Sequence, residues 1–254
     1  MIRNFLTVIT FSLALFSGHS HGQGPAQTPG TPSVLLELFS SEGCSSCPEA
    51  DAFAYEILRL SDSTHSPVFV IDYHVDIWNR SGWVDSFSTP EFTQRQTDYM
   101  KKVKQEAMFT PMMFVNGQYG MPAGAKKEIG QAIYKELVTA AKCNLTINAA
   151  LLSDGKGLNI SYNLSSMMDS LQLVLVLAER EVTSKVTAGE NAGKMLIHHN
   201  IARRLLSVPI KNQSGTYNFP LGDFVNLEKY ILVGFLQQVN SWKVYSTDMI
   251  YFKR

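Results

Sequence analysis

The chain has 254 residues, of which 45% are hydrophobic, so it is long enough to bury one large core or two modest ones. Lysine plus arginine and aspartate plus glutamate both number 22, which leaves no excess of positive charge for binding along a phosphate backbone. This balance excludes nucleic acid as the expected partner.

The N-terminal segment has the order of a secretory signal peptide. One basic residue, Arg3, precedes an apolar run from Phe5 to Phe16. That run is about a dozen residues long, whereas a membrane-spanning helix needs roughly 20, so we expect cleavage and no stable membrane span. We predict a signal peptide at residues 1–22, a flexible leader at residues 23–33, and a periplasmic or secreted mature protein.

Two cysteines lie where the first predicted strand passes into the first predicted helix. The strand is the apolar run 34–39, and apolar residues from Ala50 to Leu60 then recur at helical spacing. Cys44 and Cys47 therefore stand at a helix N-terminus, where unpaired amides and the helix dipole favour a thiolate. In an exported chain this pair predicts a reversible dithiol, with Cys44 as the nucleophile.

Other interpretations of the cysteine pair stay open at this point. One is a structural disulfide in a non-catalytic interaction module. Another is a Cu(I)-binding or delivery site, because soft thiolates suit Cu(I) and His74 offers a third ligand. Zinc is disfavoured, because no second Cys-x-x-Cys completes a four-ligand set. Glu42, Glu49 and Asp51 oppose the helix dipole, so the direction of the Cys44 pKa shift is left open.

The chain then alternates between strands and helices. A second buried strand is expected at Val68–His74, and Thr89-Pro90-Glu91 predicts a helix start with threonine as the cap. Asn116-Gly117 between apolar runs predicts a tight hairpin, and a third helix follows over 123–142. The predicted order is strand, helix, strand, helix, strand, strand, helix.

Residues after the second strand are candidates for the rim of a site, because ligands bind at the carboxyl ends of parallel strands. His74 is predicted either beside the cysteines, where it would stabilise the Cys44 thiolate, or held by hydrogen bonds to Asp76. Trp78 and Trp83 either cover the site or are simply packed in their loop.

Beyond Cys143, which we predict to be a buried free thiol, apolar and polar residues alternate. This period is typical of strands, which we expect at 145–149, 158–164, 171–178, 217–221, 230–237 and 243–252. Residues 34–143 are thus predicted to form an α/β domain, and residues 144–254 a β-rich, sandwich-like C-terminal unit packed on it.

Two adjacent histidines, His198 and His199, fall in the second unit. On a strand they would face opposite sides, so they do not easily share a metal ion. A structural role is predicted for them, near Glu190, Asn191 and Arg203.

The element order of residues 33–142, with Cys-x-x-Cys-Pro and a later Thr-Pro before a strand, resembles the thioredoxin fold. The resemblance implies that the bond before Pro111 is cis and that Thr110-Pro111 faces the cysteine pair. Glu37 precedes the pair as the buried acid of thioredoxins does, with a loop that looks one residue longer.

Several motifs spread over the mature chain agree in order with one family. They are Glu-Leu-Phe-Ser-Ser-Glu-Gly-Cys-Ser-Ser-Cys-Pro at 37–48, His-Val-Asp-Ile-Trp at 74–78, Gly-Trp-Val-Asp at 82–85, Thr-Pro at 110–111, Gly-Glu-Asn at 189–191 and His-His-Asn at 198–200. Together they resemble the secreted bacterial proteins catalogued as domain of unknown function 1223. The resemblance implies a fold and names no substrate.

The combined interpretation is an exported, thioredoxin-like thiol-disulfide oxidoreductase that needs no cofactor. Its redox-active centre is expected at Cys44, Cys47 and Pro111, supported by Glu37, Pro48, His74, Asp76, Trp78 and Thr110. Its expected partners are protein or small-molecule thiols and disulfides in the cell envelope. A Cu(I) protein using Cys44, Cys47 and His74, or a non-catalytic interaction module, is the alternative.

Overall fold

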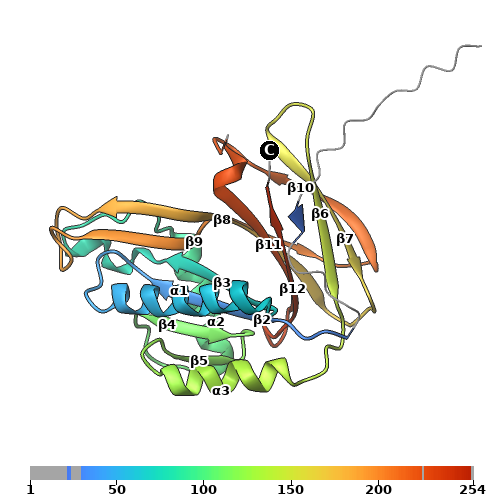
Figure 1. Cartoon of the computed structure of the whole chain (residues 1–254), viewed down its shortest axis with the longest axis horizontal. Helices are drawn as coiled ribbons and strands as arrows, with labels where there is room; N and C mark the ends of the chain where they lie inside the picture. The colour runs from blue at the N-terminus through green and yellow to red at the C-terminus, as the bar shows by residue number, and fades with distance from the viewer. Residues whose placement is uncertain (1–21, 24–29, 225, 253–254) are drawn as a thin grey trace, which may run out of the picture.

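The computed structural model describes residues 22–23, 30–224 and 226–252 (Figure 1). The predicted signal peptide lies outside the described residues except for Gly22, and so does most of the predicted leader. In the part of the chain that is described, no helix has the length and apolar character needed to cross a membrane.

The first half of the chain follows the predicted order of strands and helices. Its elements are β2 (Val34–Ser40), α1 (Cys47–Thr64), β3 (Val68–His74), the 3-10 turn η1 (Asp76–Ser81), α2 (Pro90–Val103), β4 (Met112–Val115), β5 (Tyr119–Pro122) and α3 (Lys126–Leu137). β2 runs parallel to β3 and antiparallel to β4. The predicted cap of α2 is confirmed, because the Thr89 side chain accepts a hydrogen bond from the Phe92 amide at 3.2 Å.

The second half is built mostly from strands, as its period-two pattern predicted. They are β6 (Leu145–Leu151), β7 (Gly157–Leu164), β8 (Leu171–Lys185), β9 (Met195–Pro209), β10 (Ser214–Pro220), β11 (Tyr230–Gln238) and β12 (Val244–Tyr251), with a short η2 (Leu227–Lys229) and an N-terminal β1 (Gly22–Gln23). The sequence did not predict β9. Its alternation is interrupted by the polar run His198-His199-Asn200 and by Arg203-Arg204.

The two halves share one mixed sheet of nine strands, in the order β1-β12-β11-β8-β9-β3-β2-β4-β5. They join where β9 lies parallel to β3, with Asp72 opposite Ile201. In Figure 1 the β8–β9 hairpin extends past β3 and α1, while β6, β7 and β10 lie at the opposite end as a separate three-stranded sheet. The large sheet therefore runs through both predicted units, and a domain boundary at residue 143 stays a prediction.

Hydrophobic cores lie on both faces of β2. Leu36 and Leu38 pack with α1 and α3, whereas Leu35 and Phe39 pack with α2 and with residues of β8, β11 and β12. A further core fills the space between the three-stranded sheet and the β8, β11 and β12 part of the large sheet. All seven residues of β2 are buried, as expected for a central strand covered on both faces. This strand therefore fixes the position from which the cysteine turn departs.

The C-terminal end of the predicted leader is held against the fold. The Gly30 amide donates to Asn144 Oδ1 at 2.6 Å, and the Thr31 carbonyl accepts from Asn144 Nδ2 at 2.8 Å. The Ser33 hydroxyl oxygen accepts from the Thr247 amide at 2.8 Å. Residues 30–33 of the predicted leader are therefore connected by hydrogen bonds to the second half of the chain.

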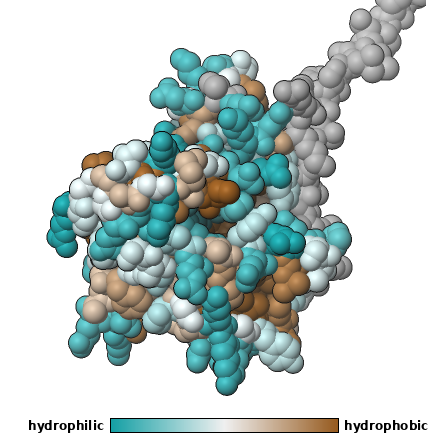
Figure 2. Space-filling model, turned by 60° about the vertical axis from the view of Figure 1, so that its left-hand side comes forward, coloured by the Kyte–Doolittle hydropathy of each residue, from teal (hydrophilic) through white to brown (hydrophobic). Residues whose placement is uncertain are grey.

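The face shown in Figure 2 carries hydrophobic side chains in small groups among hydrophilic ones. Large apolar residues that are exposed come from many different elements, for example Leu60 of α1, Tyr134 of α3 and Ile197 of β9. Single exposed apolar side chains are normal on a protein surface. These scattered side chains therefore do not by themselves mark a binding surface.

The Asn116-Gly117 hairpin is confirmed, with φ of 45° and 64° at its two central residues. A Cβ atom on Gly117 would overlap the carbonyl oxygen of Trp242 and lie 2.8 Å from Tyr99 Cε1. At Gly155, where φ is 68°, an added Cβ meets nothing within 4 Å.

Gly117→Ala is accordingly expected to destabilise the protein more than Gly155→Ala. Both variants carry the cost of positive φ, about 1–2 kcal/mol. Only Gly117→Ala adds a steric overlap, for which we expect a further loss of about 1–3 kcal/mol. Urea denaturation of the two variants measures the difference. Equal losses would contradict the close approach of the hairpin to Trp242.

Candidate functional site

Cys44 and Cys47 face each other across the turn that leads into α1. They are paired as a disulfide, with Cα atoms 5.4 Å apart, a spacing typical of such bonds. The residues between them, Ser45 and Ser46, are exposed, but Cys44 is 2% exposed and Cys47 0%. Pro48 lies in the first turn of α1, where its missing N–H costs no helix hydrogen bond. The pair is thus covered by its own turn.

Thr110 and Pro111 approach the cysteine pair from the loop before β4, and the bond between them is cis, as predicted. The Sγ atom of Cys44 lies 3.7 Å from the Thr110 carbonyl oxygen and 3.5 Å from Ser46 Oγ. Trp78 borders the same place, because its indole N–H donates to Thr110 Oγ1 at 2.7 Å. A Cβ atom on Gly43 would lie only 2.9 Å from Trp78 Cβ, so the turn packs closely against this tryptophan.

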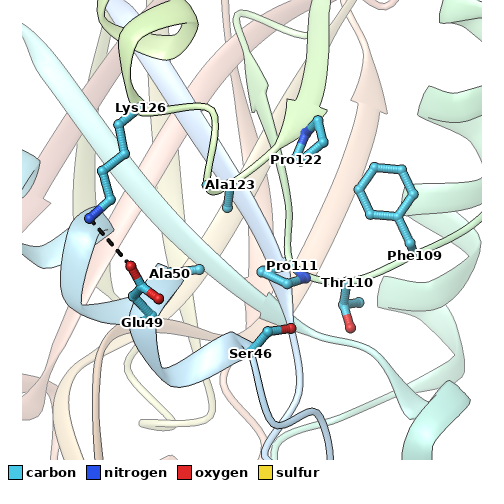
Figure 3. Close-up of a pocket in the computed structure, with 10 residues that line it drawn as sticks. Ser46, Glu49, Ala50, Phe109, Thr110, Pro111, Pro122, Ala123 and Lys126 are labelled. Carbon is cyan, nitrogen blue, oxygen red and sulfur yellow. Dashed lines mark ion pairs between the residues drawn. The ribbon is translucent and has the colours of Figure 1, made fainter.

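A pocket of about 460 Å³ opens beside the pair. It is lined mostly by apolar groups, from Ser46, Glu49, Ala50, Phe109, Thr110, Pro111, Pro122, Ala123, Gly124 and Lys126. Figure 3 shows Ser46 next to Thr110 and Pro111, with the ion pair between Glu49 and Lys126, 3.7 Å long, at one side. Neither cysteine lines the pocket, but two of its lining residues, Ser46 and Thr110, contact Cys44 Sγ.

The loop between β8 and β9 holds the cysteine turn from another side. Asn191 is fully buried, and its Nδ2 donates to the carbonyl oxygens of Glu42 at 2.8 Å and Cys44 at 2.9 Å. The Ser45 amide donates to Glu190 Oε2 at 3.0 Å, and the hydrogen bonds from Ser45 lower the pKa of Glu190. The Gly-Glu-Asn motif therefore binds the backbone of the cysteine turn.

Glu42, two residues before Cys44, points into the interior. Its Oε2 accepts from the Trp83 indole N–H at 2.7 Å, and its Oε1 lies 3.3 Å from His198 Nε2. Burial by itself raises the pKa of Glu42, but hydrogen bonds, the strongest from His198, outweigh burial and lower it. The side chain before the cysteines is thus an ionised, buried group.

His74 lies at the end of β3, fully buried behind the turn. Its Nδ1 is 2.7 Å from Asp85 Oδ2 and its Nε2 is 3.3 Å from Asp72 Oδ2. Burial alone would lower the pKa of His74, but the two carboxylates raise it well above its usual value. The interpretation that paired His74 with Asp76 is wrong, because Asp76 accepts instead from the Thr93 hydroxyl at 2.5 Å.

Asp85 joins His74 to the cysteine turn. One carboxylate oxygen accepts from the Glu42 amide at 2.8 Å, and the other accepts from the Phe87 amide at 2.9 Å. Burial raises the pKa of Asp85, but the His74 charge and these hydrogen bonds lower it to about 2. Asp85 ends the Gly-Trp-Val-Asp motif, and no local pattern predicts its contact with His74, because 11 residues separate the two.

His198 comes from β9 and lies edge-on against His74, with 4.6 Å between ring centroids. Its Nδ1 is 3.2 Å from Asp51 Oδ2, and its Nε2 approaches Glu42. Burial lowers the pKa of His198, but Asp51 and Glu42 raise it to about 8. Burial and the nearby Asp72 raise the pKa of Asp51. A role for His198 behind the cysteine turn was missed, because β9 was not predicted.

His199 faces the other side of β9, as predicted for adjacent residues of a strand. Its ring stacks on Tyr55 with 3.6 Å between centroids, and its Nε2 lies 3.5 Å from Glu181 Oε2. The two histidines therefore have separate environments, and only His198 belongs to the buried cluster.

The three carboxylates that were expected to oppose the dipole of α1 each have a cationic or N–H partner. Glu42 contacts Trp83 and His198, Asp51 contacts His198, and Glu49 contacts Lys126. These partners partly neutralise the negative charge of the three carboxylates. The positive end of the helix dipole is consequently less opposed at the cysteines than the sequence indicated.

Glu37 is buried in the core around α2. Arg95 Nη2 lies 2.6 Å from its Oε1, and the Tyr99 hydroxyl donates to its Oε2. Its carboxylate is therefore committed to residues of α2, and the structure does not place it among the contacts of the cysteine pair given above.

In the described part of the chain, one group of three or more His, Cys, Asp and Glu residues brings its ligand atoms together. It consists of Asp51, Asp72, His74 and His198, and it contains no cysteine. The Cu(I) set of Cys44, Cys47 and His74 is therefore not assembled.

Cys143 is confirmed as a buried free thiol. Its Sγ lies 2.9 Å from the Ser166 carbonyl oxygen. It belongs to the core between the two sheets and not to the cysteine turn.

A family with the description "Protein of unknown function (DUF1223)" matches residues 35–237. No curated protein matches the chain. The crystal structure of protein AGR_C_4864 from Agrobacterium tumefaciens is 22% identical, with a TM-score of 0.69, and the match covers 90% of this chain and 97% of that one. A domain of the outer membrane lipoprotein Omp28 from Porphyromonas gingivalis is 13% identical, with a TM-score of 0.28, over 44% of this chain and 89% of that one. The first of these structures has the same mixed fold.

Proposed function

The chain belongs to the DUF1223 family, whose description assigns no activity, so we infer its function from the site itself. We propose that it is a thiol-disulfide oxidoreductase of the cell envelope. The observation that carries this proposal is the Cys44–Cys47 pair at the start of α1, next to Thr110 and beside an open pocket. The signal-peptide pattern of residues 1–22 supports an exported protein.

The arrangement of the first half supports a thioredoxin-like assignment. Parallel β2 and β3 are followed by the antiparallel pair β4 and β5, with helices between the first strands and after the last. This order places the end of β2, the start of α1 and the loop before β4 at one edge of the sheet. The cysteines and Thr110 meet at that edge.

The proposed reaction is a two-step disulfide exchange. In the reduced protein the Cys44 thiolate attacks one sulfur of a partner disulfide, forms a mixed disulfide and releases the first partner thiolate. The Cys47 thiolate then attacks Cys44 Sγ, which closes the Cys44–Cys47 bond and releases the second partner thiolate. Two electrons pass from the protein dithiol to the partner disulfide. Oxidation of a partner dithiol is the same sequence in reverse.

Burial of the pair limits what can react with it. Because Cys44 is only 2% exposed and its Sγ lies against Ser46 Oγ and the Thr110 carbonyl oxygen, a flat protein surface does not reach the sulfur. A small thiol, or an extended segment that lies in the pocket beside Ser46, fits this access better. We therefore propose a flexible peptide segment or a small disulfide as the substrate.

Cys47→Ser tests the reaction most simply, because it removes the resolving thiol and leaves the nucleophile. We expect this variant, expressed in the envelope, to accumulate mixed disulfides that dissociate on reduction. Cys44→Ser should trap none, and Cys143→Ser should behave as the wild type because Cys143 is buried elsewhere. Non-reducing gels of alkylated extracts provide the readout. Equal trapping by Cys44→Ser and Cys47→Ser would contradict the assignment of Cys44 as nucleophile.

Gly124→Trp is expected to slow reaction with a peptide disulfide by about tenfold, equal to about 1.4 kcal/mol of lost binding. Gly124 lines the pocket, and a Cβ atom there meets nothing within 4 Å, so the indole can fill the pocket without strain on the backbone. Gly130→Trp is the matched control, because Gly130 is also open but does not line this pocket. Stopped-flow formation of the mixed disulfide measures both. Equal rates in the two variants would exclude the pocket as the binding place.

A further inference from the structure

We propose that Asp51, Asp72, His74 and His198 form a binding site for Zn²⁺ or a similar divalent first-row cation. The site lies behind the cysteine turn. One ligand atom from each of these residues lies within 4.8 Å of the other three. The residues come from α1, β3 and β9, so the site joins both halves of the chain. The metal site does not depend on the proposed redox reaction.

The two histidines are oriented as metal ligands are. His74 contacts Asp85 through Nδ1, which leaves Nε2, and His198 contacts Glu42 through Nε2, which leaves Nδ1. Among the described residues, these two remaining nitrogens and Asp51 Oδ1 are buried polar atoms without a hydrogen bond of good geometry, and each nitrogen instead lies 3.2–3.3 Å from a carboxylate oxygen of the cluster. Metal-bound histidines typically bind a carboxylate through the second ring nitrogen. Both histidines show that pattern here.

The spacing of the ligand atoms suits a tetrahedral ion. His74 Nε2 lies 3.3 Å from Asp72 Oδ2, and His198 Nδ1 lies 3.2 Å from Asp51 Oδ2. With metal–ligand bonds of about 2.0–2.1 Å, tetrahedral ligand atoms are about 3.3–3.4 Å apart. Two of the six distances between ligand atoms therefore already match a tetrahedral ion. The other four are no longer than 4.8 Å, so the residues would have to move closer together to bind one.

The donor set indicates which ion binds. Two imidazoles and two carboxylates suit Zn²⁺ and similar first-row cations, whereas Cu(I) prefers thiolate and thioether sulfur. Ca²⁺ and Mg²⁺ prefer oxygen ligands alone. The choice of Zn²⁺ thus follows from nitrogen and oxygen donors without sulfur.

The residues around the four ligands link the site to the cysteine turn. The Ser40 hydroxyl donates to Asp72 Oδ1 at 2.8 Å, which leaves Oδ2 for the ion. Of the two carboxylates that contact the histidines, Glu42 lies in the turn before Cys44, and Asp85 accepts a hydrogen bond from the Glu42 amide. A bound ion would therefore fix the position of that turn.

The test uses the full mature protein in its disulfide form, stripped with a chelator and titrated with Zn²⁺ against a chromophoric competitor. We expect one equivalent to bind, with the same affinity in the Cys44→Ser, Cys47→Ser double variant. His198→Gln should weaken binding by about 100-fold or more, because even residues that only orient a ligand contribute about 10–100-fold. His199→Gln is the matched control, since its ring faces Tyr55 on the other side of β9.

X-ray absorption of the zinc-loaded wild type gives a result that does not depend on how the variants fold. We expect a first shell of nitrogen and oxygen only, at about 2.0–2.1 Å. Sulfur in that shell, loss of binding in the double cysteine variant, an equal loss in His198→Gln and His199→Gln, or the absence of stoichiometric binding would each overturn the proposal.

Discussion

Cys44→Ser is expected to reduce disulfide turnover to the uncatalysed background. In the proposed mechanism the Cys44 thiolate forms the first covalent bond with the partner, and no other described thiol replaces it: Cys47 is fully buried and Cys143 lies in a separate core. The assay follows reduction of a peptide disulfide by glutathione with catalytic amounts of mature protein. Cys143→Ser should retain the wild-type rate.

The fold should survive this substitution, which keeps the comparison informative. Closing a loop of so few residues contributes only about 2 kcal/mol in the chain-entropy treatment of disulfides. Circular dichroism of Cys44→Ser should therefore show a folded protein at 25 °C. Turnover that persists in Cys44→Ser, or that falls equally in Cys143→Ser, would contradict the proposed mechanism.

Arg95→Met is expected to destabilise the protein by about 3–5 kcal/mol, because it leaves the buried Glu37 carboxylate without its cation. Arg95 contacts Glu37 Oε1 through both Nη2, at 2.6 Å, and Nε, at 2.7 Å. Its guanidinium also lies over the ring of Tyr99, 4.9 Å from the centroid. The lost interactions are thus those of a desolvated ion pair, and urea denaturation measures their loss.

Lys101→Met on the same helix is the control for Arg95→Met. Lys101 also pairs with an acid, Asp98 at 3.1 Å, but it is exposed to solvent. Exposed pairs contribute about 0–1 kcal/mol, so Lys101→Met should change stability little. Adding Glu37→Gln to Arg95→Met should restore part of the loss, since no unpaired buried charge is left. Equal losses in Arg95→Met and Lys101→Met would contradict the buried pair.

Local signals predicted much of the first half of the fold. The apolar run of β2, the Thr89 cap of α2 and the Asn116-Gly117 turn depend on neighbouring residues, which the sequence displays directly. The C-terminal strands followed from period-two alternation. β9 was not predicted, because His198 and the arginines after it interrupt the apolar pattern of a strand that is buried only around its pairing with β3.

Only those residues of the candidate site were predicted that lie close together in the sequence or belong to a recognisable motif. Cys44, Cys47 and Thr110 were found in that way. The partners of His74 were not, because the sequence offered Asp76 nearby, while the structure uses Asp72, two residues earlier on the same strand, and Asp85. The contact of His198 with Asp51 joins residues on β9 and α1 that no local pattern connects.

The measurement that tests the central claim most directly is a redox titration of the folded protein with Cys143 removed. The Cys143→Ser variant is equilibrated in glutathione or dithiothreitol buffers of graded potential, quenched in acid, alkylated and weighed by mass spectrometry. The account predicts a reversible two-electron transition, in which both Cys44 and Cys47 gain or lose the alkyl label and about 30 mV changes the ratio of states tenfold. A pair that stays oxidised in native protein under excess dithiothreitol, and reduces only after unfolding, would contradict it.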